Sequence, residues 1–271
     1  MKFNCGITGH TGVLGSEFIK KHNTIKFIKF YGDIANKKNV RNWLVKKNIS
    51  IIFHLAAIVP TQVVKKNPKK ANKINYLGTK ILINELIKLK KIKWFFFSST
   101  SHVYKFSQKK LNEKSRLKPS SLYGLTKLKA EKYIQKKLKK AKIPFCIGRI
   151  FSFTHKKQTA DFVIPSIIKK AKSKKKIVYF ENTEHYRDFL STGDICNAIN
   201  ILFKKKANGI YNIGSGKKVL ISDIIKLIFK KYKKIYKISK NNKSTWLIAD
   251  INKIKKFKWK PKNNIISIVN E

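Results

Sequence analysis

The feature that most constrains the fold lies at the start of the chain, where a short apolar stretch, residues 3–8, runs into regularly spaced glycines. Gly9, Gly12 and Gly15 recur at every third position, and a helical pattern follows them. Gly9 would let the chain turn off a strand, Gly12 would let the backbone approach a pyrophosphate, and Gly15 would let the helix pack closely on the strand. The helix would aim its first N–H groups at the phosphates. The spacing therefore predicts a dinucleotide-binding turn, with an ordinary strand–turn–helix connection as the alternative.

Composition limits the classes of protein that fit this start. With 271 residues, 42% of them hydrophobic, the chain can form one large α/β domain or a nucleotide domain with a smaller cap. The formal charge of +50 raises a nucleic-acid hypothesis. The lysines are spread over nearly every predicted helix and loop, without the aromatic strand signatures of RNA-binding sheets, so no specific nucleic acid is expected. The planar guanidinium of arginine forms paired hydrogen bonds that a lysine ammonium cannot, so each arginine in so lysine-rich a chain is a candidate for a specific contact. The chain has four arginines: Arg41, Arg116, Arg149 and Arg187.

Three cysteines, Cys5, Cys146 and Cys196, are odd in number and lie in apolar surroundings, which indicates reduced, buried thiols in a cytoplasmic protein. No metal-binding spacing is visible, so no metal is predicted. The N-terminus lacks the apolar core of a signal peptide. The longest apolar run, residues 49–60, is interrupted by His54 and is too short to span a bilayer. We therefore expect a soluble chain without a membrane span.

The first half of the chain alternates between predicted helices and strands. A helix is expected over 16–21 and a strand over 25–31. Asp33 then lies 18 positions beyond Gly15, near the place where a carboxylate grips the adenosine ribose of NAD; it could equally cap a helix over 39–47 or occupy a turn. Residues 49–55 form a continuous apolar run typical of a central parallel strand.

The next stretch places hydroxyl, phenol and ammonium groups in the same region. A helix is predicted over 71–89, and a strand over 93–97 leads into the run Ser98-Ser99-Thr100-Ser101, which is either a loop or part of the ligand crevice. A long helix opens near Ser121, and a spacing of four puts Tyr123 and Lys127 on one of its faces. An ammonium beside a phenol favours phenolate, so we expect Lys127 to lower the pKa of Tyr123.

In this order, the features of almost the whole chain resemble the extended short-chain dehydrogenases/reductases of the nucleotide-sugar epimerase/dehydratase family. The resemblance is carried by the glycine turn, the strand end His54-Leu55-Ala56-Ala57, the hydroxyls up to Thr100, Asn75 with Gly78-Thr79, and the pair Tyr123 and Lys127. It implies an α/β fold, a Rossmann-type doubly wound parallel sheet with a smaller C-terminal substrate-binding lobe. The NAD(P)-binding domain is expected over residues 1–150 and about 186–214, and the discontinuous lobe over about 151–185 and 215–271.

The resemblance also implies roles for individual residues. Tyr123 would be the general acid/base, Lys127 would hold the nicotinamide ribose, and Thr100 would hydrogen-bond the reacting oxygen. The residues expected to bind the cofactor are Gly9, Thr11, Gly12, Val13, Leu14, Gly15, Asp33, Ile34, Leu55, Ala56, Ala57, Tyr123 and Lys127. The residues expected to bind a nucleotide-sugar substrate are Ser99, Ser152 and Arg187, with Arg187 gripping the diphosphate.

The cofactor is expected to be NAD or NADP, with NAD favoured. The segment between the first helix and Gly32 is short, so two alignments stay open. If Asp33 meets the ribose hydroxyl, NAD is favoured. If Asp33 and Ile34 instead contact adenine, Lys29 could tolerate the extra phosphate of NADP.

The two residues after Thr100 reduce the number of candidate reactions that the resemblance implies. Dehydratases of the family resemble one another in an Asp-Glu pair at this point, whereas this chain has Ser101-His102, so dehydration is not expected. A 4-keto-sugar reductase is favoured, a 4-epimerase that retains its NAD is the alternative, and a non-catalytic cofactor- or RNA-binding member of the fold is the third hypothesis. His102 or His155 would be an extra acid or a loop residue. The helices over 71–89 and 121–139 resemble a dimerising pair, so a homodimer is expected, although both helices carry many lysines.

Overall fold

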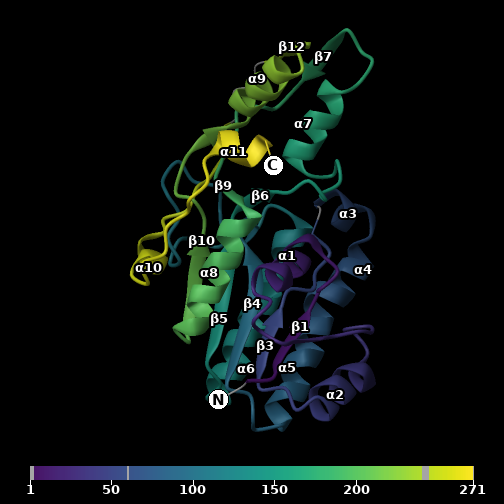
Figure 1. Ribbon diagram of the computed structural model, residues 1–271, viewed down its shortest axis with the longest axis vertical. Helices are drawn as coiled ribbons and strands as arrows, with labels where there is room; N and C mark the ends of the chain where they lie inside the picture. Colours follow the sequence, from purple (N-terminus) through teal and green to yellow (C-terminus); the bar gives the residue numbers. More distant parts are fainter. Residues whose placement is uncertain (1–2, 60, 240–243, 271) are drawn as a thin grey trace.

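The centre of the molecule is a six-stranded parallel sheet (Figure 1). The computed structural model describes residues 3–59, 61–239 and 244–270. The strand order is β10–β5–β4–β3–β1–β2, so the chain moves outward in one direction from β1 to β2 and in the other from β3 onward. The carboxyl ends of β1 and β3 therefore flank the point where the order reverses, which is where such sheets bind ligands. The strands are β1 (Cys5–Thr8), β2 (Phe27–Lys29), β3 (Ile51–His54), β4 (Trp94–Thr100), β5 (Phe145–Ile150) and β10 (Gly209–Ile213).

Helices cover both faces of this sheet, as a doubly wound fold requires. One face packs against α1 (Val13–Lys21) and α8 (Thr192–Lys204), and the other against α2 (Lys37–Lys46), α5 (Thr79–Lys88) and α6 (Leu122–Lys140). Central strands such as β3 are buried along their whole length because both faces are covered. The predicted fold class is confirmed.

A third apolar cluster lies at one end of the molecule, beyond the carboxyl ends of the sheet strands (Figure 1). Its main elements are the helices α7 (Val163–Ala171) and α9 (Ile221–Lys231) and the paired strands β7 (Ile177–Phe180) and β12 (Ile235–Ile238). The remaining short elements are β6 (Ser152–Thr154), β8 (Tyr186–Arg187), β9 (Phe189–Ser191), β11 (Val219–Leu220), β13 (Trp246–Leu247), α10 (Asn252–Lys255) and α11 (Ile265–Asn270). Of these, α10 packs against β10 at the edge of the large sheet, and α11 contacts β9.

Several element boundaries differ from the prediction. The single helix expected over 71–89 is a succession of α4 (Pro68–Asn72), a π-helical turn η1 (Lys73–Gly78) and α5, preceded by α3 (Thr61–Lys66). A π turn shifts the side-chain register inside a helix, which a 3.6-residue pattern does not reveal. Within the described residues, no helix combines the length and apolarity that crossing a membrane would need.

Strand β4 is longer than predicted, because it includes the hydroxyl-bearing residues up to Thr100. The hydroxyls are therefore part of the sheet, and the loop interpretation is wrong for Ser98 to Thr100. Ser98, Ser99 and Thr100 interrupt the apolar pattern of the strand. They nevertheless pair with β5, as far as Thr100 opposite Ile150.

Candidate active site

The glycine turn has the geometry that a bound diphosphate needs. Gly9 has a φ of +72°, and a Cβ on it would lie 2.5 Å from the Ala56 backbone nitrogen. A Cβ on Gly15 would collide with the Gly9 carbonyl oxygen, whereas one on Gly12 would meet only that oxygen, at 3.4 Å. The turn is therefore closely packed at Gly9 and Gly15 and has open space beside Gly12. Gly12 caps α1 without any side-chain hydrogen bond, so the first N–H groups of this helix stay available to an anion.

The ends of β1 and β3 are joined by the hydroxyl of Thr8 and the imidazole of His54. His54 is fully buried; its Nδ1 lies 2.7 Å from Thr8 Oγ1 and its Nε2 lies 2.8 Å from Thr79 Oγ1. Burial, and then the charge of Lys127, lower the pKa of His54 to about 3, so its imidazole is neutral at neutral pH. Ala56 N also donates to Thr8 Oγ1, at 3.3 Å, which places the predicted Leu55–Ala57 segment beside the glycine turn.

Other predicted cofactor residues divide between the surface and the core. Thr11 is exposed, Val13 is half-buried, and Leu14 packs against the core that includes Phe18. Ile34 is 4% exposed and packs in the opposite core, against Gly78, so its side chain cannot form the proposed adenine contact. The Ile34 side chain therefore closes the core, and a contact of the Ile34 backbone with adenine stays a prediction.

Asp33 lies at the surface near the end of β2. Its Oδ1 accepts a hydrogen bond from Ala35 N at 2.8 Å, and its Oδ2 lies 3.3 Å from Lys73 Nζ. The residue that caps α2 is Asn36, whose side chain accepts from Asn39 N, so the capping alternative for Asp33 is wrong and the turn alternative is confirmed. On the neighbouring turn, burial and then Lys29 lower the pKa of His10.

The three predicted catalytic side chains come together at the carboxyl end of β4. Thr100 ends this strand, and Tyr123 and Lys127 lie one turn apart on α6. Thr100 Oγ1 accepts a hydrogen bond from His102 N at 3.2 Å, and the Thr100 side chain lies close enough to the Tyr123 phenol to lower its pKa as a hydrogen-bonding group. All three side chains are buried, and Lys127 is only 2% exposed.

Burial dominates the electrostatics of this group. It raises the pKa of Tyr123 to about 12, although the nearby Thr100 side chain acts in the opposite direction. Burial also lowers the pKa of Lys127 to about 7, while the charge of Glu131 raises it. The prediction that Lys127 lowers the pKa of Tyr123 is therefore wrong for this structure, because removal from water destabilises the phenolate and the ammonium alike.

Ser99 does not face an open site. Its hydroxyl donates to the carboxylate of Glu131, and the same carboxylate accepts bonds from Arg149 Nε at 3.1 Å and Arg149 Nη2 at 2.7 Å. Ser99, Glu131 and Arg149 are each at most 2% exposed. The assignment of Ser99 to the substrate is corrected accordingly. Sequence reasoning missed Glu131, although one acid four residues after Lys127 in so basic a chain was a usable signal.

Asn75 lies in the π turn and ties three segments together. Its side chain accepts from Ile58 N at 2.8 Å and donates to Ile58 O at 2.9 Å and to Thr126 Oγ1 at 3.2 Å. It thereby fixes the segment that follows β3 against α6.

Ser152 and Arg187 lie on short strands of two separate small sheets, Ser152 on β6 and Arg187 on β8. Ser152 pairs with Phe189 in the β6–β9 register, two residues beyond Arg187. Arg187 Nη1 donates to the carbonyl oxygens of Tyr186 and Thr245, both at 2.8 Å. Backbone carbonyl groups of the protein therefore already bind part of the guanidinium that was predicted to bind the substrate diphosphate.

The two histidines weighed as extra acids differ in position. The His102 ring lies edge-on to Tyr123, with 5.8 Å between the ring centroids, whereas His155 Nε2 lies 3.6 Å from Glu17 of α1. Burial and the charge of Arg187 lower the pKa of His102 to about 4, so it is a neutral side chain beside the catalytic group. Among the described residues, no three His, Cys, Asp or Glu side chains gather as a metal site.

Comparison with known proteins agrees with this geometry. The family model described as GDP-mannose 4,6 dehydratase matches residues 14–271. A dTDP-D-glucose 4,6-dehydratase of Dictyostelium discoideum is 31% identical over 74% of this chain. The match covers about half of that relative's own length, 49%. A protein of Bacillus subtilis named an uncharacterized UDP-glucose epimerase is 29% identical over 82% of this chain and 80% of its own.

Solved structures show the same fold. The UDP-glucose 4-epimerase of Thermotoga maritima superposes with a TM-score of 0.86 at 20% identity, covering 98% of this chain and 96% of the epimerase. The chain therefore belongs to the NAD-dependent epimerase/dehydratase family of extended short-chain dehydrogenases/reductases, which acts on nucleotide sugars. The family predicted from the sequence is confirmed, and the particular reaction is taken up below.

Proposed function

We propose that this protein is an NAD(P)-dependent nucleotide-sugar reductase that acts at a keto group on sugar C4. The observation that carries the proposal is the burial of Thr100, Tyr123 and Lys127 together at the carboxyl end of β4, which raises the pKa of Tyr123 to about 12. A phenol of this kind is protonated at neutral pH, so it begins the reaction as a proton donor, as carbonyl reduction requires.

The cofactor fits the glycine turn and the space beside α6. Gly9 to Gly15 would hold the diphosphate with backbone N–H groups at the open side of Gly12, and Lys127 would hold the nicotinamide ribose. Structural neighbours support this assignment, since the Thermus thermophilus UDP-glucose 4-epimerase is complexed with NAD and the Pseudomonas aeruginosa protein RMD with NADPH. We propose NAD in preference to NADP, because the carboxylate of Asp33 lies at the end of β2.

When bound, the cofactor supplies the hydride that reaches C4. Tyr123 donates its phenolic proton to the carbonyl oxygen, so the C=O double bond becomes one C–H and one O–H bond. Thr100 hydrogen-bonds the same oxygen and stabilises the charge that develops there. The Lys127 ammonium would then return a proton to the phenolate. A pKa of about 7 suits this transfer, because the ammonium can give up its proton at neutral pH.

A 4-epimerase that retains its NAD is the second candidate. It is favoured by the Bacillus subtilis relative, which is named an uncharacterized UDP-glucose epimerase and aligns over most of both chains. We also propose a homodimer through α5 and α6, and UDP-, dTDP- and GDP-linked sugars as the substrates to test first.

The decisive variant is Tyr123→Phe, which removes one hydroxyl and little volume. We expect turnover of UDP- or dTDP-linked 4-keto-6-deoxyglucose with reduced cofactor to fall by about 10²–10⁴-fold, while cofactor affinity stays nearly unchanged. Tyr133→Phe is the matched control, because Tyr133 lies on the same helix and its hydroxyl donates to Asn84. Turnover retained in Tyr123→Phe would disprove the assignment.

A further inference from the structure

A buried ion pair between Arg149 and Glu131 connects the strands β4 and β5 to helix α6, which carries Tyr123 and Lys127. Arg149 pairs with Ser99 across β5 and β4, and Ser99 is the residue before Thr100. Glu131 lies on α6 one turn beyond Lys127 and receives bonds from both Arg149 and Ser99. A single carboxylate therefore joins the strand of Thr100 to the helix of Tyr123 and Lys127.

The surroundings of Lys127 make a nearby negative charge consequential. Its Nζ lies 4.1 Å from the centroid of the Phe97 ring, and no carboxylate in the described part of the chain lies within ion-pair distance of it. The titratable groups that interact with its charge are Glu131 from α6 and His54 from β3; Tyr123 lies one turn before it on α6, and Arg149 from β5 holds Glu131. Tyr123 and His54 are neutral at neutral pH, so Glu131 is the group that can favour the ammonium.

We propose that Glu131, held in place by Arg149 and Ser99, is a positioning residue that keeps the Lys127 side chain charged in its buried site. This inference deepens the proposed function, because the proposed mechanism needs a charged Lys127. Arg149 contributes by fixing the carboxylate, since a bidentate guanidinium leaves it little freedom to turn toward or away from Lys127.

The direction of the expected effect follows from linkage. The favourable interaction exists only while Lys127 is charged, so it is absent at high pH and complete at low pH. Each unit by which Glu131 raises the pKa of Lys127 then appears as about a tenfold change in the unfolding constant at low pH. Replacing Glu131 should therefore become more harmful as the pH falls through about 7.

The test is a double-mutant cycle of Glu131→Gln and Lys127→Met, with unfolding constants measured by denaturant titration from pH 5 to pH 9. We expect the coupling between the two positions to be near one-fold at pH 9 and to grow at least about tenfold by pH 5. A coupling that does not change with pH would overturn the proposal. His54 and His102 are present in all four proteins, so their protonation cancels in the cycle.

Two further variants keep the test decisive. Glu131→Gln leaves a buried unpaired guanidinium, and should it not fold, Glu131→Gln combined with Arg149→Met replaces it in the cycle. Asp194→Asn is the matched control, because Asp194 is 2% exposed and accepts several hydrogen bonds at the start of α8. It should lower stability without coupling to Lys127. Since stability is measured without cofactor, a protein that binds none would contradict the proposed function and leave this result unaffected.

Discussion

At the scale of single residues, the glycine turn separates the needs of folding from those of binding. Gly15 and Gly12 look alike in the sequence, yet a Cβ at Gly15 would collide with backbone and a Cβ at Gly12 would not. Gly12 also has an ordinary φ of −71°, which any residue can adopt. The structure thus assigns close helix packing to Gly15 and the open approach side to Gly12.

These two glycines give a matched pair of variants. We expect Gly15→Ala to lower the free energy of unfolding by about 1–3 kcal/mol or more, because the backbone must shift to admit the methyl group. Gly12→Ala should change it by less than about 1 kcal/mol, while weakening the affinity for NADH at least severalfold. Denaturant unfolding and NADH fluorescence titration measure the two effects. Equal stability losses, or unchanged NADH affinity in Gly12→Ala, would contradict the division of roles.

Residue types and spacing predicted much of the site, and three-dimensional packing decided the rest. Tyr123, Lys127 and Thr100 gather as expected because their spacing and strand-end position follow from periodic elements. Ser99 was misassigned because alternate residues of a buried strand point to opposite faces, and only the finished core decides which face each one fills. The pKa of Tyr123 was misjudged because the depth of burial outweighs one nearby charge.

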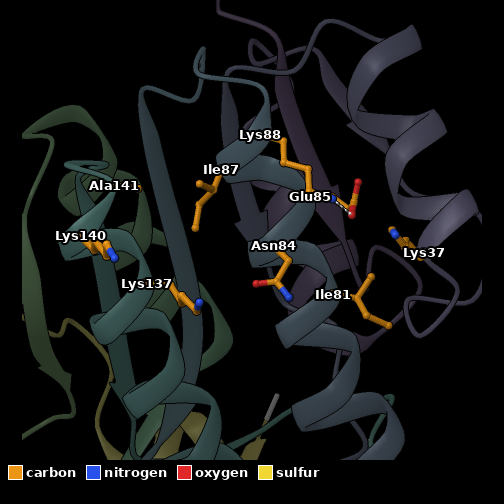
Figure 2. A pocket seen from close by; sticks show the side chains of 9 residues that line it. All are labelled: Lys37, Ile81, Asn84, Glu85, Ile87, Lys88, Lys137, Lys140 and Ala141. Carbon is orange, nitrogen blue, oxygen red and sulfur yellow. Dashed lines mark hydrogen bonds and ion pairs between the residues drawn. The ribbon is translucent and has the colours of Figure 1, made fainter.

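At the scale of elements, helices α5 and α6 combine an apolar groove with a ring of positive charge. Figure 2 shows the groove between them, where Lys37, Lys88, Lys137 and Lys140 surround a lining that includes Ile81, Ile87 and Ala141. One acid, Glu85, is among the lining residues, and it is paired with Lys88 at 2.9 Å. The groove contains none of the predicted catalytic residues, and it lies on the helix pair through which we propose the homodimer.

The proposed homodimer through this helix pair should therefore depend on salt in an unusual direction. Two such faces repel over about 30 Å at 0.01 M salt but over only about 10 Å at 0.1 M. We expect the dimer fraction in analytical ultracentrifugation to rise with added NaCl. Lys137→Glu should strengthen the dimer at low salt, whereas Lys204→Glu on α8, at the opposite face of the sheet, should not. A dimer that dissociates as salt is added would contradict this interface.

Element order was predictable because the apolar runs and turn residues alternate clearly. The boundaries of the elements were harder to predict. The π turn at Lys73–Gly78 and the extension of β4 to Thr100 arise from tertiary contacts, including the bonds from Asn75 to Ile58 and the pairing of β4 with β5. Both deviations occur beside the candidate site, where local preference yields to positioning.

At the scale of the whole molecule, the high charge and the fold point to different functions, and the fold is the more specific signal. A charge of +50 attracts any polyanion, whereas the buried group of Thr100, Tyr123 and Lys127 at the carboxyl edge of a doubly wound sheet has the composition that our proposed proton transfer needs. The family match covers nearly the full chain, which agrees with the fold.

The most direct test of the account is the cofactor content of the purified protein, read from its absorbance spectrum and from the supernatant after denaturation. A reductase releases its oxidised cofactor, so we expect little bound cofactor and the uptake of about one NADH or NADPH per chain from solution. Cofactor that co-purifies at near one per chain would contradict the reductase and favour the epimerase. A protein that binds neither cofactor would contradict the enzymatic account as a whole.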